Sequence, residues 1–572
     1  MSVAEPTIKH KNNKPGKKLI AVIIILIAVN IAAWFFYSQA DLTRDKRYTI
    51  TDATKGMLKH LDSKVEVLLF LTGDDLPAPF QRLSNSTEAL LRNFRDISNN
   101  KITYRVIDPV GKDTTALQIL SQYRMSGIPV TISAGKKGSA QKMIFPWALV
   151  TTVDAQGKSI AYPVFLQETN TFNLNRQTLL KSEILLEYNL ANGIHQLTRK
   201  EIPAVAYLTG NGELFDGHIG AMFSTLSRYY RLDTFNLGQN KIIPPAFKTI
   251  IINRPTAAFT ETDKFKIDQY VMNGGHVLWS INMVTGTLDS LKGGQFNAMP
   301  IELNLSDLLF NYGVRVNSNI IEDAVSHAFI PLEARTGKAE ATMFDWIYFP
   351  VLNAGSDHPI VKNLNGVLTR FVSSIDTNAN DPSIKKTVLL SSSRYSKMEA
   401  APLPVILESA IERPNPAAFP HHNLTGAILL EGNFTSSFAT RKPVEVADMI
   451  DSLKLQVKTK TAAPGKMVVI SDADILSNEY AEKVGPSEMG LFAPDQSVRF
   501  DNETFLLNCM EYMNDPDNLL EARNKSFDNQ ILDPKVVEKE RTTWQFINIG
   551  VPVIAVLIFG SVFFFVRKRR YA

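Results

Sequence analysis

Three acidic residues lie in two loops after predicted strands, at the places where α/β sheets commonly bind ligands. Glu213 closes the loop 209–213, Thr-Gly-Asn-Gly-Glu, between a predicted strand and a predicted helix, and Asp472 and Asp474 directly follow the apolar run 466–470. Backbone N–H groups before a helix can bind an anion, and carboxylates can hold a hard cation. Because Glu213 would repel an anion and two carboxylates are too few for a cation, we predict structural or partner-contacting roles for both loops.

Three other patterns resemble reactive motifs but lack a required residue. The triplet 157–159, Gly-Lys-Ser, lacks the first glycine of a phosphate-binding loop because Thr152 stands there, so a β-hairpin turn is predicted. Residues 485–489 miss the last glycine of G-x-S-x-G. The single cysteine, Cys509, lies among apolar neighbours in a predicted helix and is expected to be buried. We predict no catalytic residue, no cofactor and no metal site, and therefore no enzyme.

Two uncharged apolar runs are predicted to span a membrane. The first, residues 19–39, includes Leu19–Tyr37, which reaches roughly 28 Å at about 1.5 Å per residue, and follows a lysine-rich tail, 1–18. The second, 546–566, precedes the basic tail 567–572. Positive charge favours the cytoplasmic side, so both termini are predicted to be cytoplasmic and the residues between the spans to lie on the opposite face. A cleaved signal peptide is the alternative for the first run.

The charge distribution argues against nucleic-acid binding. The formal net charge of +4 is concentrated in the two tails, and the residues between them carry a slight acidic excess. A protein that binds nucleic acid through a general basic surface would carry that charge on its folded body. The basic tails are therefore interpreted as topology signals beside the spans.

The region 41–198 is predicted to be an α/β layer domain of thioredoxin-like arrangement. A nearly continuous apolar run indicates a buried first strand, and no Cys-x-x-Cys follows it. A hairpin of 142–153 with 159–165 is expected to close the domain. The other predicted elements are helices 51–61, 86–97 (capped by Ser86 or Thr87) and 114–123, and strands 65–71, 102–107 and 127–132.

A long amphipathic helix, 179–197, leads into a second α/β domain, 199–513. Alternating strands and helices predict a parallel sheet with right-handed crossovers, of the flavodoxin-like or amidotransferase-like kind. Residues 286–433 are predicted to be an insertion, and 514–545 a connector to the second span. The predicted strands are 204–208, 248–253, 276–281, 427–430 and 466–470, and the helices are 218–230, 261–272 and 502–512.

Several segments together resemble a known family. They are Asp41-Leu42-Thr43, 46–49, 186–188, 210–214, 267–275, 308–315, 430–436 and 470–474. In these segments the chain resembles the GldG proteins, the gliding-motility-associated ABC-transporter auxiliary proteins of Bacteroidetes. The match spans nearly the whole chain, with one departure: Asn211 stands where a histidine is more usual.

The resemblance implies a non-catalytic accessory subunit of the bacterial inner membrane, with a mainly periplasmic body. Its implied partners are a polytopic permease, a separate cytoplasmic ATPase, the lipid bilayer and periplasmic motility or secretion components, without nucleic acid. The implied function is gliding motility and linked surface-protein secretion. It also implies a central domain like the amidotransferase-like domains of intraflagellar-transport proteins, where such a domain serves binding.

Three alternatives are kept open beside this interpretation. They are a two-span polysaccharide chain-length regulator, a periplasmic hydrolase on an amidotransferase-like fold and a two-span sensor. A chain-length regulator would carry long helices, whereas strands and helices alternate here. A hydrolase would need a nucleophile at a strand-to-helix elbow, and a sensor would need a cytoplasmic output domain.

Seven residues are candidates for partner contacts. Asn30 is a polar side chain well inside the first apolar run, where it could bond a neighbouring helix. The segment after that run would join the domains to the membrane through Asp41, Arg47 and Tyr48. The remaining candidates are Glu213, Asp472 and Asp474 in the loops after predicted strands.

Overall fold

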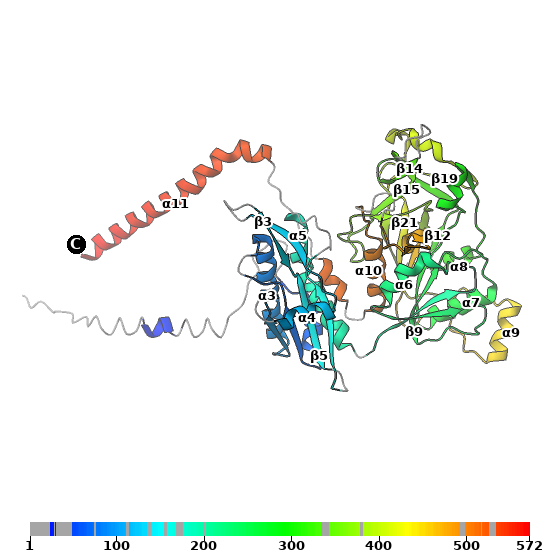
Figure 1. The fold of residues 1–572 in the computed structure, drawn as a ribbon, viewed down its shortest axis with the longest axis horizontal. Helices are drawn as coiled ribbons and strands as arrows, with labels where there is room; N and C mark the ends of the chain where they lie inside the picture. Colours follow the sequence, from blue (N-terminus) through cyan, green and yellow to red (C-terminus); the bar gives the residue numbers. More distant parts are fainter. Residues whose placement is uncertain are drawn as a thin grey trace, which may run out of the picture. The chain divides into compact units, whose positions relative to one another are not determined.

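A computed structural model of the chain describes most of its residues and divides it into two compact units, 1–525 and 526–572 (Figure 1). The described residues are 23–27, 29, 49–73, 76–109, 114–133, 139–153, 157–167, 176–199, 201–332, 342–377, 381–491, 498–515, 518–524 and 534–571. Within the first unit we distinguish an N-terminal region, 49–199, from a central region, 201–515. Each contains its own β-sheet.

The N-terminal region is built on a four-stranded sheet in the order β2-β1-β5-β6. Strand β1 is parallel to β2, with Val67 opposite Tyr104, and antiparallel to β5, with Val67 opposite Val150. A separate antiparallel pair, β3 and β4, lies outside this sheet. The bounds are β1 Val65–Leu69, β2 Ile102–Val106, β3 Ile128–Ser133, β4 Ser139–Ile144, β5 Trp147–Val153 and β6 Ser159–Phe165.

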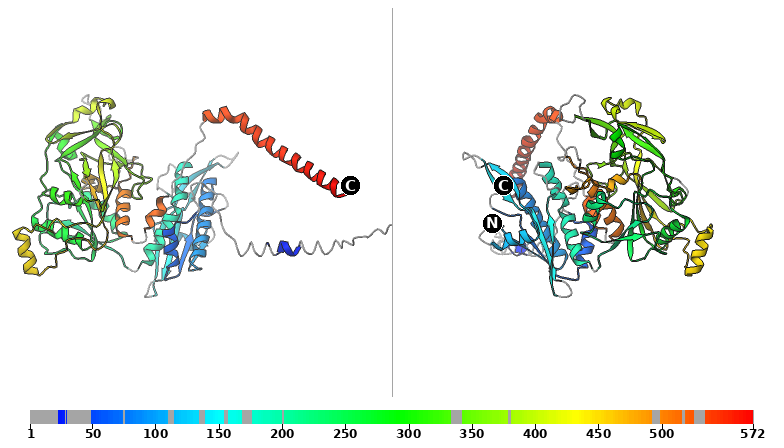
Figure 2. Two further views of the ribbon diagram at one scale, coloured as in Figure 1. Left: turned by 180° about the vertical axis from the view of Figure 1, so that it is seen from behind. Right: turned by 45° about the vertical axis from the view of Figure 1, so that its right-hand side comes forward.

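Helices cover both faces of this sheet because apolar side chains alternate to both sides of β1. Val65, Val67 and Leu69 pack with helices α2, α3 and α5, whereas Leu68 packs on the other face with α4. This burial on both faces is typical of α/β layers. The ribbons show the helices packed around the sheet (Figures 1 and 2). The helices are α2 Asp52–Lys59, α3 Ala78–Ile97, α4 Thr114–Gln122 and α5 Arg176–Thr198.

Two predictions for this region were wrong in their boundaries. Helix α3 begins at Ala78 rather than near Ser86, because Pro77 and Pro79 form its first turn, where the missing N–H groups of proline cost nothing. Thr87 donates its hydroxyl to Leu83 O inside the helix instead of capping it. The expected strand 142–153 is divided at Pro146 into β4 and β5, but the hairpin of β5 with β6 is confirmed.

The central region contains a ten-stranded sheet with the order β14-β15-β18-β21-β22-β10-β9-β7-β8, and β16 beside β15. The strands from β22 to β8 are parallel, and the others are antiparallel. Their bounds are β7 Ala204–Thr209, β8 Arg231–Asn236, β9 Phe247–Asn253, β10 His276–Ser280, β14 His327–Leu332, β15 Thr342–Ala354, β16 Val367–Leu368, β18 Ile384–Ser391, β21 Thr425–Gly432 and β22 Gly465–Ile470.

Helices also cover both faces of the parallel strands. In β7, Val205 and Tyr207 pack with α6 and α10, whereas Ala206 and Leu208 pack with α7 and α8. Helix α7 begins with a capping box, in which Thr260 Oγ1 accepts a hydrogen bond from Asp263 N. The helices are α6 Gly220–Leu226, α7 Glu261–Met272, α8 Ser306–Tyr312 and α10 Asn502–Asn514 (Figure 1).

The predicted parallel sheet is confirmed, but its extent and one helix differ from the prediction. The expected insertion 286–433 supplies β15 and β18, which extend the same sheet by antiparallel pairing. The expected helix 218–230 is shorter and is followed by β8. The remaining elements are η2 Gly217–Ile219, η3 Leu288–Gly293, β11 Gln295–Ala298, β12 Val314–Val316, β13 Asn319–Asp323, β17 Ile375–Thr377, β19 Ser396–Ala400, β20 Leu403–Ile406, η4 Leu407–Ile411, η5 Pro416–Ala418, α9 Val444–Leu453, η6 Ala473–Leu476, β23 Tyr480–Ala481, β24 Gly485–Pro486 and η7 Leu519–Asn524.

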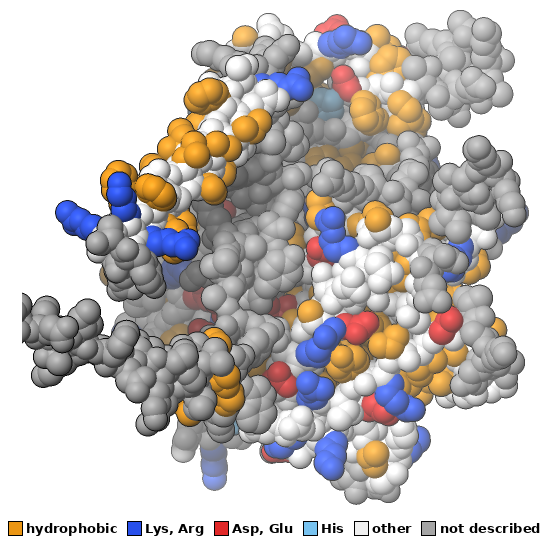
Figure 3. Space-filling model, turned by 90° about the vertical axis from the view of Figure 1, so that its left-hand side faces the viewer, with side chains coloured by type: hydrophobic (Ala, Val, Ile, Leu, Met, Phe, Trp, Pro, Cys, Tyr) orange, Lys and Arg blue, Asp and Glu red, His pale blue; other side chains and the backbone are white. Residues whose placement is uncertain are grey.

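The described part of the second unit is one long helix, α11, Pro534–Tyr571. Its segment Glu540–Arg569 is, among the described residues, the one stretch long and apolar enough to cross a membrane. Apolar side chains lie along it and basic side chains gather at its C-terminal end (Figure 3). This helix contains the predicted second span, 546–566. The predicted first span lies outside the described residues except for 23–27 and 29.

Replacing Gly432 by alanine should destabilise the central sheet. Gly432 ends β21 with a φ of 147°, and an added Cβ would lie 2.2 Å from the Ser383 carbonyl oxygen. We expect Gly432→Ala to lower the free energy of unfolding by about 2 to 4 kcal/mol through backbone strain and displacement of β18. Denaturant unfolding of the purified chain, followed by tryptophan fluorescence, measures this change.

The matched control is Gly293→Ala. Its added Cβ would meet no atom within 4 Å, so its unfolding midpoint should stay near that of the unaltered chain. Equal midpoints for Gly432→Ala and Gly293→Ala would contradict the close approach at the end of β21.

Candidate functional site

The candidate site lies at the carboxyl edge of the parallel strands. The chain passes from β7 to β8 on one side and then to β9 on the other side of β7, so the strand order reverses between β7 and β9. Loops diverge at such a reversal, and open α/β sheets bind their ligands there. Glu213 follows β7 and the pair Asp472 and Asp474 follows β22, so the structure places all three at this edge.

The loop after β7 is held by hydrogen bonds to neighbouring chain segments. Asn211 O accepts hydrogen bonds from Thr256 N at 3.1 Å and from Ala257 N at 2.9 Å. Gly212 has a φ of 75°, and an added Cβ would lie 2.2 Å from Thr256 Oγ1, so only glycine fits there. The loop is therefore a fixed support at the strand end.

Glu213 is turned into this loop and not toward solvent. Its Oε2 accepts a hydrogen bond from Asn211 N at 2.8 Å, and the residue is 8% exposed. Burial raises the pKa of Glu213, although hydrogen bonds from backbone N–H groups oppose that shift. The carboxylate thus shapes the loop, and a partner would meet the loop's outer residues first.

Asp472 has a similar internal role at the end of β22. It is fully buried, and its two carboxylate oxygens accept hydrogen bonds from Asp474 N at 2.8 Å and Arg370 N at 2.6 Å. Burial and the nearby Asp474 carboxylate raise the pKa of Asp472 to about 8. As the N-cap of η6, Asp472 joins β22 to the segment that contains Arg370.

Two arginines complete the charged part of the edge. Arg254, directly after β9, pairs through Nη1 with Asp474 Oδ1 at 3.4 Å, and Arg370 pairs with Glu479. Sequence reasoning missed both arginines. The strand-end rule that selected Asp472 also applies to Arg254, whereas no local pattern marks Arg370.

An exposed apolar surface borders the charged cluster, which is formed by Arg254, Asp474, Arg370 and Glu479. The hairpin of β23 and β24 is held on η2 by Asn478, whose N donates to His218 O at 2.8 Å and whose Nδ2 donates to Gly217 O at 3.0 Å. The ring of Tyr480 lies 5.8 Å from that of His218. We call the following residues the edge surface: Phe215, 58% exposed, Tyr480, 40% exposed, Val484, 88% exposed, and His218, which is half-buried.

The edge surface has the character of a protein-binding surface. Aromatic and aliphatic side chains are presented to solvent on a hairpin that is fixed by hydrogen bonds. Exposed apolar groups bordered by charged residues often mark protein interfaces, and aromatic side chains supply much of the binding energy in them. The arrangement therefore suits binding better than bond-making chemistry.

The remaining predicted site residues do not add to this edge. Asn30, Asp41, Arg47 and Tyr48 lie outside the described residues. Cys509 is buried in α10 as predicted, and burial raises the pKa of its thiol. Within the described part of the chain, no three His, Cys, Asp or Glu side chains are grouped so that they could hold a metal ion.

The raised pKa of Asp472 predicts a pH dependence of stability. Because its folded pKa lies above the unfolded value, its contribution to stability is complete at low pH and is lost as pH rises toward the folded pKa. The free energy of unfolding should fall by about 1 to 3 kcal/mol between pH 6 and pH 9. Asp474→Asn removes the neighbouring charge, lowers the pKa of Asp472 and should reduce that loss.

Denaturant unfolding at the two pH values measures this effect. Asp233→Asn, at an exposed carboxylate of β8, is the control and should keep the pH dependence of the unaltered chain. An identical loss of stability in Asp474→Asn and Asp233→Asn would contradict the coupling between Asp472 and Asp474.

Comparison with known proteins identifies relatives of both regions. A family model described as an ABC-type uncharacterized transport system matches residues 203–509, and a model described as a domain of unknown function matches 44–151. An uncharacterized protein of Borreliella burgdorferi is 25% identical over 416 residues, which cover 71% of this chain and 75% of that protein.

Two solved structures show weak likeness. The mmIFT52 N-terminal domain is 13% identical, with a TM-score of 0.27, over 54% of this chain and 97% of that chain. The exo-β-1,4-mannosidase Op5Man5 from Opitutaceae bacterium strain TAV5 is 11% identical, with a TM-score of 0.16, over 58% of this chain and 45% of that chain. TM-scores this low do not indicate a shared overall fold.

The first family model covers more than half of the chain, including the parallel strands, the edge surface and the charged cluster. The chain therefore belongs to the ABC-type uncharacterized transport system family, whose members are auxiliary proteins of ABC transporters.

Proposed function

We propose that this chain is a non-catalytic, membrane-anchored accessory subunit that binds other proteins of an ABC-type transporter. The observation that carries the proposal is the family match over 203–509, in the same chain as a helix able to cross a membrane. The helix holds the body at the membrane, and the body supplies the binding surfaces. A separate ATPase and a polytopic permease are the expected partners.

The chemistry of the carboxyl edge supports a non-catalytic role. Glu213 and Asp472 are buried and accept hydrogen bonds from backbone N–H groups, and Asp474 and Arg370 have ion-pair partners. A catalytic acid or base must reach its substrate, which these buried carboxylates do not. The sequence contains no phosphate-binding loop motif, so ATP hydrolysis would come from another chain.

The arrangement of the strands supports the folds that we propose for the N-terminal and central regions. The order β2-β1-β5-β6, with α3 and α5 on one face and α4 on the other, supports a thioredoxin-like N-terminal region without redox cysteines. In chain order the five parallel strands lie 2-1-3-4-5, which supports a flavodoxin-like or amidotransferase-like central region. Because we propose that both regions only bind other proteins, we expect no cofactor in either region.

The cellular setting follows from the resemblance to GldG and from the basic tails. We place the chain in a bacterial inner membrane with both termini cytoplasmic and the body periplasmic. In that setting the transporter would serve gliding motility and linked surface-protein secretion. The edge surface would bind a periplasmic component of that machinery.

Disruption of the edge surface should weaken a partner contact without unfolding the chain. Val484 is 88% exposed, so Val484→Asp removes an apolar contact and adds a charge that a partner must desolvate. We expect recovery of one periplasmic partner with the tagged chain, from detergent-solubilised native membranes, to fall by about tenfold. Quantitative mass spectrometry of the recovered proteins measures this change.

Val444→Asp is the matched control for this experiment. Val444 is 72% exposed on α9 and lies outside the edge surface. Its recovered proteins should equal those of the unaltered chain. If the purified chain alone hydrolysed ATP, or if neither an ATPase nor a permease were recovered with it, the proposed function would be wrong.

A further inference from the structure

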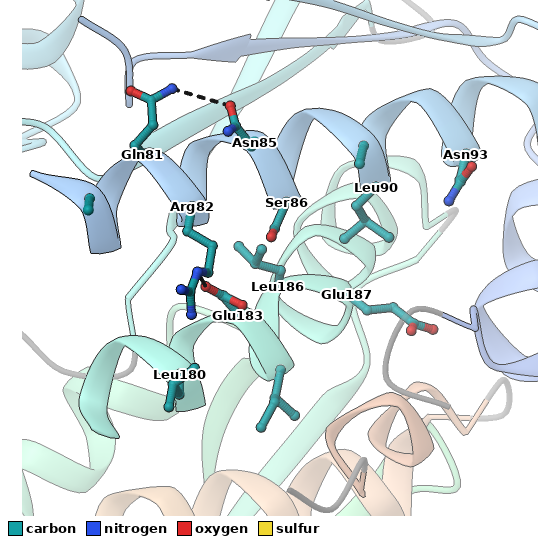
Figure 4. Close-up of a pocket in the computed structure, with 13 residues that line it drawn as sticks. Gln81, Arg82, Asn85, Ser86, Leu90, Asn93, Leu180, Glu183, Leu186 and Glu187 are labelled. Atoms are coloured by element: carbon teal, nitrogen blue, oxygen red, sulfur yellow. Dashed lines mark hydrogen bonds and ion pairs between the residues drawn. The ribbon is translucent and has the colours of Figure 1, made fainter. Parts of the chain in front are cut away.

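A groove of about 620 Å³ lies between α3 and α5 of the N-terminal region (Figure 4). Its walls include Leu90 of α3 and Leu180, Ile184 and Leu186 of α5. In Figure 4 the side chains of Ser86 and Leu90 point from α3 toward α5. The groove is distinct from the edge surface, which belongs to the central region.

Short side chains of α3 leave part of this face open, beside longer ones such as Arg82 and Leu90. Ala78, Ser86 and Ala89 lie about one or two helical turns apart on the side that faces the groove. The opposite side of α3 is filled by large apolar residues that pack on the sheet, such as Phe80 and Leu91. An added helix could therefore approach α3 closely, as helices do where small residues line the contact.

The charged side chains of the groove already have partners within the chain, so they do not require an oppositely charged occupant. Arg82 Nε lies 3.9 Å from Glu183 Oε1, and Glu187 Oε1 accepts hydrogen bonds from Thr51 N and Thr51 Oγ1, both at 2.8 Å. The other polar lining side chains are the uncharged Gln81, Asn85, Ser86 and Asn93. An amphipathic helix could place its apolar side against the leucines and bond these amides, which is the helix-in-groove mode of recognition.

The covalent link between this region and α11 indicates which kind of protein would supply such a helix. Leu519 of η7 packs in the core of the N-terminal region, with Leu58 of α2 and Leu190 of α5. Only the segment 525–533 separates η7 from α11, the helix able to cross a membrane. At roughly 3.3 to 3.6 Å per residue this segment spans at most about 32 Å. The region with the groove is thus tethered directly to the membrane helix.

We propose that this groove binds an amphipathic, uncharged helix of the membrane-embedded subunit of the transporter, the permease. The proposal rests on the proposed function and adds the place and the mode of that contact. Because so short a segment links the N-terminal region to the membrane helix, a membrane-embedded subunit is the partner that we expect for this groove. Its helix would lie between α3 and α5, with its apolar side on Leu90, Leu180 and Ile184.

Site-specific photo-crosslinking in native membranes tests the assignment. A photo-reactive benzoyl-phenylalanine is placed in the full chain at Asn85 or at Ala89, both exposed residues that line the groove. The control position is Arg95, which lies on the same helix outside the groove, with a side chain 42% exposed. We expect both groove positions to yield a crosslink to the permease at least about fivefold above Arg95.

A substitution gives an independent readout of the same contact. Ala89→Arg places a long charged side chain in the groove, and recovery of the permease should fall by about tenfold. Ala246→Arg, which adds the same side chain to an exposed loop between β8 and β9, should leave recovery unchanged. Thermal unfolding of both variants should match that of the unaltered chain, because neither alanine is buried.

The outcomes separate this proposal from the proposed function. If the unaltered chain recovers the permease but the groove positions crosslink to nothing, to lipid or to a soluble protein, the groove assignment is overturned and the proposed function stands. Equal crosslinking from Arg95 overturns it as well. If the unaltered chain recovers no permease, both proposals fail.

Discussion

Burial of the parallel strands on both faces is the constraint on which the central region depends. Residues such as Val205, Leu208 and Ile251 are completely buried, and each side chain of this kind stabilises the fold by roughly 1.5 to 3 kcal/mol. Helices occupy both faces, so a ligand or partner can reach these strands only at their ends. Because β7, β9 and β22 run parallel in one sheet, the polar residues that follow them lie at the same edge.

The buried carboxylates of that edge are bonded to the chain's own backbone and side chains. The carboxylates of Glu213 and Asp472 orient backbone segments, and Arg254 joins the ends of β9 and β22 through Asp474. Such bonding fixes the loops that carry Phe215 and Tyr480. A rigid surface loses little conformational entropy on binding, which favours protein recognition.

A second constraint is the short helix η7, which connects the cores of the two regions of the first unit. Leu519 packs in the N-terminal core, while Leu520 and Ala522 pack in the central core. Tyr188 of α5 also packs in the central core, where it donates a hydrogen bond to the partly buried Glu511. The chain thus enters α11 from a segment that both cores hold.

Local sequence patterns predicted the elements that are determined by residues close together in the sequence. Helix α7 has the predicted bounds, because Thr260 and Asp263 form a capping box and Gly274 has the positive φ that ends it. Glu213 and Asp472 were found because they lie in the loops that follow apolar strands. The pairing of β15 and β18 with the main sheet was missed, because it joins segments far apart in sequence. Arg370 was missed for the same reason: its contact with Asp472 spans 102 residues.

The central claim is that this chain works as an accessory subunit of an ABC-type transporter. Native mass spectrometry of the intact complex, released from native membranes through a tag on this chain, tests that claim most directly. The account predicts an assembly that contains this chain, a permease and an ATPase in fixed proportion. A chain released alone, or assembled only with copies of itself, would contradict it.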